Sequence, residues 1–163
     1  MKNLLIIRHA KSSWDNITQR DFDRPLNDRG NRDAPIMAKR ILKRGADIDA
    51  FVSSPANRAF TTATYFAEAY NVKKKNIIVI DSLYHAEVNM FYEVINNLDN
   101  ELKTVALFSH NPGITSFVNS LTQTRIDNMP TCGIFAVKAD VKSWGDFTAA
   151  EKTFWFFDYP KLG

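Results

Sequence analysis

The chain has 163 residues, of which 45% are hydrophobic and 24% are charged. This length suits one compact domain with a substantial core, and we expect residues 1–163 to form a single domain. The net charge is +3, and the 21 Lys and Arg are interleaved with 18 Asp and Glu, which is not the basic stripe of a nucleic-acid-binding protein.

Two further features of the composition restrict where the protein works. No apolar stretch has the length of a membrane span, and the four apolar residues that precede Arg8 are too few for the core of a signal peptide. The single Cys132 cannot form an internal disulfide, which agrees with a reducing compartment. We therefore expect a cytoplasmic protein that binds neither membrane nor nucleic acid.

The first half of the chain alternates predicted strands and helices. Residues 3–8 form a short apolar strand, and a polar segment follows it. Apolar residues at helical spacing predict a helix that starts at Asp28 and stops at Gly45. The segment "IDAFVSS" is a second predicted strand, and Pro55 opens a second helix over "PANRAFTTATYFAEAY".

The second half begins with the same alternation and then changes. The predicted elements are a strand at 76–83, a helix at 89–98, a strand at 103–110 and a helix at 113–122. The strands "GIFAVKAD" and "KTFWFFDYP" then follow without a helix between them, which favours an antiparallel pair. Together these elements predict a three-layer α/β/α sandwich, with a mostly parallel sheet and antiparallel strands at its C-terminal end.

Polar side chains follow each of the first four predicted strands. In such folds the ligand lies beyond the carboxyl ends of the strands, so parallel strands would bring these side chains to one edge of the sheet. The residues concerned are Arg8 and His9, Arg58, His85 and Glu87, and His110 and Asn111.

The gathering of two histidines and two arginines favours an anion site. Taken singly, His85, Arg58 and Ser12 are ordinary structural or surface residues. Two imidazoles and two guanidinium groups at one rim, however, call for an anion to neutralise them. A zinc site built from the three histidines competes with this interpretation. Nearby cations oppose a dication, and the spacing matches no common zinc motif, so we expect no metal.

Phosphoryl transfer through a covalent intermediate would use these groups. A neutral imidazole, with an unperturbed pKa of about 6.5, offers a nucleophilic lone pair at pH 7. Arginine side chains bind phosphoryl oxygens through forked, charge-assisted hydrogen bonds. They neutralise the negative charge of these oxygens, which is the task of magnesium in other enzymes. The chemistry therefore needs no cofactor.

Three segments resemble the signature blocks of the histidine phosphatase superfamily, whose fold is shared with cofactor-dependent phosphoglycerate mutases. They are "LLIIRHAKSSW", "SSPANRAFTTA" and "FSHNPGI". Short SixA-like phosphohistidine phosphatases are more similar, because they lack the helical insertions of the mutases and carry a segment like "RPLNDRG". The resemblance implies a phosphoglycerate mutase-like fold.

The resemblance also implies roles for individual residues. His9 would be the nucleophile that becomes phosphorylated, Arg8 and Arg58 would hold the phosphoryl group, and His110 would stabilise the transferring charge. Ser12 and Asn111 are further candidates for contacts with the substrate.

Mutase-like members supply a Glu after the third strand as general acid, and the nearest candidates here are Glu87 and His85. The imidazole of phosphohistidine leaves with its own ring protonated, so a SixA-like enzyme has less need of an external acid.

The resemblance predicts a shallow, open pocket that accepts a phosphorylated protein, such as a histidine phosphotransfer domain, or a small phosphoramidate. Two other functions stay open. One is a broad phosphomonoesterase for small metabolites, and the other is a phosphate-binding module without turnover. The presence of both His9 and His110 favours catalysis, because a binding module needs only the arginines and backbone amides.

Overall fold

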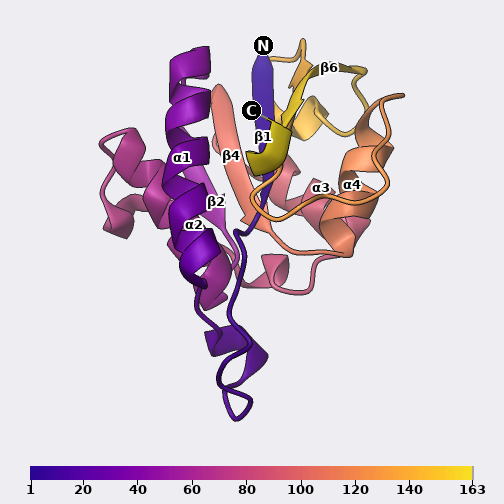
Figure 1. The fold of residues 1–163 in the computed structure, drawn as a ribbon. Helices are drawn as coiled ribbons and strands as arrows, with labels where there is room; N and C mark the ends of the chain where they lie inside the picture. Colours follow the sequence, from indigo (N-terminus) through magenta and orange to yellow (C-terminus); the bar gives the residue numbers. More distant parts are fainter. Residues whose placement is uncertain (163) are drawn as a thin grey trace.

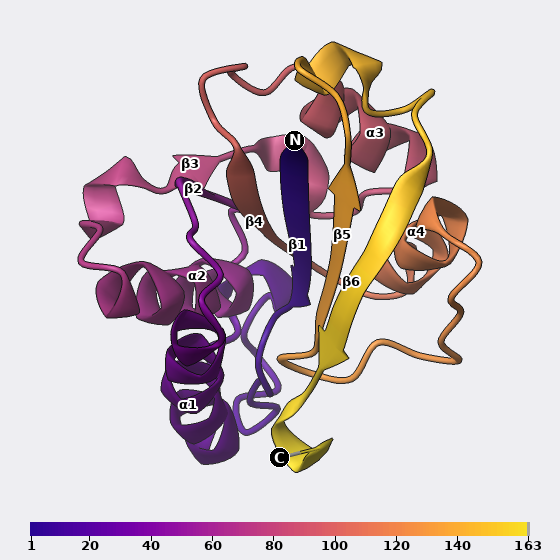
Figure 2. The ribbon, with the colours of Figure 1, turned by 90° about the horizontal axis from the view of Figure 1, so that it is seen from above.

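The computed structural model describes residues 1–162. The fold is built on a six-stranded sheet. Its order is β3-β2-β4-β1-β5-β6 (Figure 2). The strands are β1 (Lys2–Arg8), β2 (Ala50–Ser53), β3 (Ile78–Val79), β4 (Thr104–Ser109), β5 (Ile134–Ala139) and β6 (Lys152–Asp158).

The strand directions confirm the predicted mixture. β1 pairs in parallel with β4, β4 with β2, and β2 with β3. β5 runs antiparallel to β1, and β6 runs antiparallel to β5. Only β5 therefore opposes the common direction, and the carboxyl ends of the other strands point to one edge of the sheet.

Helices cover both faces of the sheet (Figure 1). The helices α1 (Asp28–Arg44) and α2 (Asn57–Ala69) lie on one face, and α3 (Val88–Asn96) and α4 (Gly113–Leu121) lie on the other. β1 shows how the strands serve both layers, because Leu5 and Ile7 pack in the core under α1 and α2. Leu4 and Ile6 pack in the core under α3 and α4. This alternation confirms the predicted three-layer α/β fold.

The third predicted strand is much shorter than 76–83. Only Ile78 and Val79 pair with β2, and a 3-10 helix (Asp81–Leu83) follows. β3 lies at the edge of the sheet and both of its side chains are exposed, so neither a second neighbour nor core packing extends it. The apolar run at 76–83 indicated the strand but not its length.

The second helix starts later than Pro55. Ala56 has an extended backbone (ψ 139°), and its carbonyl accepts from the N–H groups of Ala59 and Phe60, so it is the N-cap residue and α2 begins at Asn57. The residues before it, Ser54 and Pro55, remain outside the helix and turn the chain at the sheet edge.

The segment "RPLNDRG" fixes the loop that leaves β1. Asn27 caps α1 by accepting from the N–H of Gly30 (2.9 Å), and its own N–H donates to the carbonyl of Lys11 (3.0 Å). A Cβ on Gly30 would lie 2.1 Å from that carbonyl oxygen, so only glycine allows this approach. Among residues 1–162, no helix has the length and apolar character needed to cross a membrane.

Candidate active site

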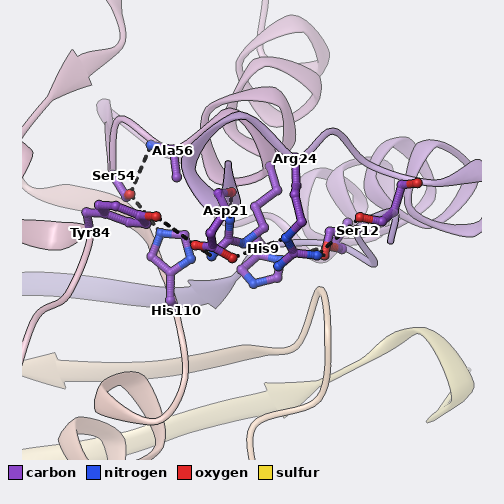
Figure 3. Close-up of polar contacts among 11 residues, drawn as sticks. His9, Ser12, Asp21, Arg24, Ser54, Ala56, Tyr84 and His110 are labelled. Carbon is purple, nitrogen blue, oxygen red and sulfur yellow. Dashed lines mark hydrogen bonds and ion pairs between the residues drawn. The ribbon is translucent and has the colours of Figure 1, made fainter. Parts of the chain in front are cut away.

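The predicted strand ends meet at one edge of the sheet. Arg8 closes β1 and His9 follows it, Ser54 follows β2, and His110 follows β4. Arg58 stands in the first turn of α2. The N–H of His9 donates to the carbonyl of the last residue of β4 (3.2 Å), which ties the two strand ends together. As a result, the rings of His9 and His110 lie 5.1 Å apart (Figure 3).

His9 is buried and held in one tautomer. Its Nδ1 lies 2.8 Å from the carbonyl oxygen of Ala10, and a carbonyl only accepts, so Nδ1 carries the proton and Nε2 keeps its lone pair. Burial lowers the pKa of His9 to about 3, helped by the charges of Arg58, Arg8 and Arg24 and opposed by the bond to Ala10. His9 is therefore a neutral imidazole at pH 7, with a lone pair on Nε2.

His110 is fixed from its other nitrogen. Nε2 lies 2.7 Å from Oγ of Ser54, and this oxygen also accepts from the N–H of Ala56 (3.2 Å; Figure 3). Because the N–H of Ala56 occupies one lone pair of this oxygen, the Ser54 hydroxyl can donate its proton to Nε2; we assign this arrangement, in which the ring proton lies on Nδ1. Burial, followed by the neighbouring His9 and Arg58, lowers the pKa of His110 to about 2. His110 is therefore a neutral donor through Nδ1.

Both site arginines are held at their terminal nitrogens. Nη1 of Arg8 donates to the carbonyl of Met129 (2.8 Å), and Nη1 of Arg58 donates to the carbonyl of Asp21 (2.8 Å). Nη2 of Arg58 also donates to Oδ2 of Asp21 (3.0 Å). The Nε atoms of both arginines are buried and have no hydrogen-bond partner in the part of the chain that the structure describes, residues 1–162.

Three buried side-chain nitrogens without a partner therefore belong to residues of the site. They are Nε of Arg8, Nε of Arg58 and Nδ1 of His110, and the only other such side-chain atom in residues 1–162 is an amide oxygen near the start of β1. Leaving a buried donor unpaired is costly, so structures rarely gather several of them without a function. Their arrangement suits the oxygens of a bound anion.

Arg24 is a site residue that the strand-end pattern did not identify. Its guanidinium is buried, donates through Nη1 to Oγ of Ser12 (2.8 Å), and stacks 3.6 Å from the centre of the Trp14 ring. Its charge contributes to the lowered pKa of His9. The hydroxyl of Ser12 thus contacts Arg24, and its predicted contact with substrate stays a prediction. The sequence signal that could have identified Arg24 was its position as the first residue of the segment "RPLNDRG".

Asp21 and Tyr84 complete the polar network around the arginines. The hydroxyl of Tyr84 donates to Oδ2 of Asp21 (2.7 Å), and Nε of Arg24 donates to Oδ1 (3.1 Å; Figure 3). Neither residue was a candidate from the sequence: Asp21 lies in a polar segment without a periodic pattern, and Tyr84 directly follows the third predicted strand but was given no role.

An open pocket lies beside His110, between the N-terminal ends of α3 and α4. We call it the outer pocket; its volume is about 370 Å³, and its lining residues are 84–88, 110–113 and Ser116. The two candidate acids, His85 and Glu87, are both exposed and line it. A Cβ on Gly113 would lie 1.9 Å from the carbonyl oxygen of Ala86, so glycine is needed where these walls meet.

Asn111 also lines the outer pocket, but its side chain is engaged within the protein. Nδ2 donates to Oδ1 of Asn128 (2.9 Å) and to the carbonyl of Met129 (3.2 Å), and Oδ1 accepts from the hydroxyl of Thr115 (2.6 Å). These bonds tie the segment before β5 to α4. The structure thus shows a structural task for Asn111, and its predicted contact with substrate stays a prediction.

His85 lines the outer pocket together with His110, and its charge is among the causes that lower the pKa of His110. Within residues 1–162, no group of three or more His, Cys, Asp and Glu side chains is arranged to hold a metal ion. Cys132 is fully buried and burial raises the pKa of its thiol. Its backbone N–H donates to the carbonyls of Arg8 and His9 (both 3.1 Å), so Cys132 supports the end of β1.

A neutral histidine with a free lone pair, fixed donors and three arginines at the carboxyl edge of an α/β sheet form a site suited to phosphoryl chemistry. Comparison with known proteins gives the family. The profile of the histidine phosphatase superfamily (branch 1) matches residues 4–84, which include Arg8, His9 and Arg58. The chain belongs to this superfamily and is a phosphatase of that class.

Solved structures extend the likeness over the whole fold. The protein described as phosphohistidine phosphatase SixA from Agrobacterium tumefaciens is 25% identical, with a TM-score of 0.81 over 98% of both chains. The protein histidine phosphatase SixA complexed with tungstate is 23% identical, with a TM-score of 0.81 over 98% of this chain and 97% of the other. A mycobacterial glucosyl-3-phosphoglycerate phosphatase is less similar, at 15% identity and a TM-score of 0.68 over 98% of both chains.

Two sequence relatives are known only as uncharacterized proteins. A chloroplastic protein of Arabidopsis thaliana is 28% identical over 152 residues, which cover 88% of this chain and 69% of the relative. A protein of Mycobacterium leprae is 29% identical over 142 residues, which cover 78% of this chain and 84% of the relative. These relatives therefore add no information about the substrate.

Proposed function

We propose that the protein hydrolyses phosphohistidine or another phosphoramidate through a covalent phosphohistidine on Nε2 of His9, without a metal ion. The observation that carries this proposal is the set of three buried nitrogens, from Arg8, Arg58 and His110, that have no hydrogen-bond partner within residues 1–162, at a site that also holds a neutral His9. We take residues 1–163 as one domain, because His110 lies outside the matched range 4–84 but follows a strand that pairs with β1.

In the first step His9 attacks phosphorus. The lone pair on Nε2 forms the new bond, the bond from phosphorus to the leaving nitrogen breaks, and that nitrogen keeps the electron pair. The free N–H groups of Arg8, Arg58 and His110 bind the three peripheral oxygens, whose charge they stabilise in the transition state. The proton on Nδ1 of His9 stays on the bond to Ala10, so the phosphorylated ring carries a positive charge.

In the second step water attacks the same phosphorus atom. The bond from phosphorus to Nε2 breaks, the electron pair returns to Nε2, and His9 is neutral again. Both protons of the water stay with the product, which leaves as dihydrogen phosphate. The positive charge of the phosphorylated ring makes it a good leaving group, so Arg8, Arg58 and His110 suffice to stabilise both transition states.

The outer pocket favours a phosphoramidate over an alkyl phosphate. An alkoxide needs a proton from a positioned acid, whereas an imidazole that is already protonated on its other nitrogen leaves as a neutral ring. We call Arg8, His9, Arg58 and His110 the phosphoryl site. The two candidate acids, Glu87 and His85, are exposed rather than held against it. The two solved SixA structures, one described as a phosphohistidine phosphatase and the other as a protein histidine phosphatase, support the same substrate class.

A protein partner is favoured by the surface beside the site. Trp14 and Ile17 are 69% and 94% exposed, and both lie on the loop that connects β1 with Arg24. Exposed apolar side chains next to an active site suit contact with a protein surface. We propose that the phosphorylated partner is a protein, for example a histidine phosphotransfer domain, and we retain a small phosphoramidate as the second substrate.

A broad phosphomonoesterase is the second candidate function. The outer pocket, with about 370 Å³ and the carboxylate of Glu87 on its wall, has room for a sugar-sized leaving group. Turnover of sugar phosphates and p-nitrophenyl phosphate at rates equal to that of phosphohistidine would favour this function.

The decisive experiment is intact-mass spectrometry after brief mixing with phosphoramidate and an alkaline quench. We expect a transient phosphate on the wild-type chain that survives alkali and is lost in acid, and no such adduct on His9→Ala. If phosphate is released without an adduct and His9→Ala stays active, His9 is not the nucleophile. If neither an adduct nor phosphate release is seen with any substrate, the chain is a phosphate-binding module.

A further inference from the structure

Asp21 is a charged residue at the site that the proposed steps do not use. It opens a 3-10 helix (Asp21–Asp23) in the loop between β1 and α1. Its carboxylate contacts Arg24 in the same loop (3.1 Å) and two residues distant in the sequence, Arg58 (3.0 Å) and Tyr84 (2.7 Å).

Asp21 is also the only acid that pairs with the site arginines. Within residues 1–162, no other carboxylate lies within ion-pair distance of Arg8, Arg24 or Arg58. Partial burial would raise the pKa of Asp21, but the hydrogen bond from Tyr84 and the contacts with both arginines outweigh it and lower the pKa to about 2. The carboxylate is therefore ionised over the whole functional range of pH.

These contacts decide which part of Arg58 faces the site. The carbonyl and the carboxylate of Asp21 accept from Nη1 and Nη2, so the two terminal nitrogens point toward the 3-10 helix and Nε remains free. Arg24 is held in a similar way, because Asp21 accepts from its Nε while Ser12 accepts from its Nη1. A single carboxylate thus fixes two guanidinium groups before any substrate arrives.

The carboxylate of Asp21 and a bound phosphate both carry negative charge. Its side chain is 46% exposed, whereas the Arg58 side chain is 7% exposed, so Asp21 lies at the rim of the site and Arg58 inside it. A negative charge at this place repels an oxyanion held by the arginines and weakens the binding of substrate phosphate and product phosphate alike.

We propose that Asp21 is a positioning residue that holds Arg58 and Arg24 in their catalytic orientation and, by its charge, limits the affinity of the site for free phosphate. This inference rests on the proposed function, because it takes the arginines to bind the phosphoryl group. It gives Asp21 two separable effects: orientation raises kcat, and repulsion speeds the release of phosphate.

The test compares Asp21→Asn with Asp23→Asn. Asp23 belongs to the same 3-10 helix and pairs with Arg20, whose side chain is 77% exposed and does not contact the site. Calorimetric titration with sodium phosphate and with tungstate measures anion affinity, and turnover of phosphoramidate measures kcat.

We expect Asp21→Asn to bind both anions about fivefold more tightly, as the loss of one partly exposed like charge implies, and to lose about tenfold in kcat. Asp23→Asn should match wild type in both measurements. A purely structural role would weaken anion binding and lower kcat together, so tighter binding with a lower kcat is the distinguishing result. Unchanged or weaker binding overturns the inference, and tighter binding with an unchanged kcat overturns the positioning role.

Asp21→Glu keeps the negative charge. It allows the inference to be tested even if Asp21→Asn fails to fold. Its anion affinity should stay within about twofold of wild type, because the repulsion is retained, and tighter binding by this variant would also overturn the inference. The titrations need no turnover. Failure of the proposed function would appear instead as a wild-type enzyme without an adduct on His9.

Discussion

The phosphoryl site and the outer pocket lie side by side but are built in opposite ways. In the phosphoryl site, His9, Arg58 and His110 are each only 6% exposed, and every one of these side chains is held by a hydrogen bond. In the outer pocket, His85 and Glu87 are exposed, and no hydrogen bond within residues 1–162 holds either side chain. The chemistry of the phosphoryl group is therefore preorganised, whereas the groups that meet the rest of the substrate remain adaptable.

This contrast predicts that changes in the phosphoryl site are far more costly than changes in the outer pocket. Arg58→Lys should have the largest effect, with a loss of about 10³-fold in kcat/KM, because lysine has neither the Nε donor nor the fork that Asp21 holds. Steady-state kinetics with phosphoramidate measures the change. The control is Arg125→Lys, which alters an exposed arginine away from the site.

A loss below about tenfold for Arg58→Lys would mean that the position needs only a positive charge. In that case the fixed geometry of the phosphoryl site would not matter, and the contrast with the outer pocket would lose its meaning.

The burial of two neutral histidines predicts an acid-sensitive fold. The pKa values of about 3 for His9 and about 2 for His110 lie well below the value of about 6.5 expected in the unfolded chain. Below pH 6.5 the unfolded chain binds protons that the folded chain does not, so the free energy of unfolding decreases as the pH falls. Above pH 7 both histidines are neutral in both states, and they contribute no dependence on pH.

Between pH 7 and pH 5 this effect amounts to about 2 kcal/mol for each histidine. Urea unfolding at the two pH values measures it, and acidic residues contribute to the total in wild type and variant alike. His110→Asn should therefore lose about 2 kcal/mol less than wild type over this range. An equal loss in both proteins would show that His110 is protonated in the folded state.

The sequence was sufficient to predict the parts of the site that stand on strands. The apolar runs before His9 and His110 mark the strand ends, and parallel strands bring such ends to one edge, so their proximity followed from topology. The short β3 was not predictable, because the extent of an edge strand depends on pairing with its neighbour.

Arg24, Asp21 and Tyr84 show where a sequence without structure is insufficient. Arg24 and Asp21 lie in a polar segment that has no periodicity, and Tyr84 directly follows the third predicted strand. Their contacts join loops separated by up to 63 residues. Arg24 could have been suspected from the segment "RPLNDRG". Nothing in the sequence indicated that the carboxylate of Asp21 would reach Arg58, because that contact depends on how the loop after β1 folds against α2.

The hydroxyl of Ser54 offers a finer test of preorganisation. Ser54→Ala removes the donor to Nε2 of His110 and frees the ring to take its other tautomer, in which Nδ1 carries no proton for the substrate. We expect a loss of about tenfold in kcat/KM. The free energy of unfolding should also fall by about 1 kcal/mol, because the buried N–H of Ala56 loses its acceptor. Ser54→Thr keeps the hydroxyl and should recover much of the activity, whereas equal activity in Ser54→Ala and wild type would show that the tautomer is fixed by other means.

The smallest effect should come from the outer pocket, where the identity of the substrate decides the result. Glu87→Gln keeps the shape of an exposed side chain and removes the only carboxylate that lines this pocket. With phosphoramidate the leaving nitrogen carries its own proton, so kcat/KM should change less than about twofold. With an alkyl phosphate such as phosphoserine, any proton that Glu87 supplies to the alkoxide is lost, and we expect a decrease of about fivefold.

Equal losses on both substrates would show that Glu87 acts by charge or position rather than as an acid. The outer pocket would then belong to the fixed machinery of the phosphoryl site, and the division between the two regions would no longer hold.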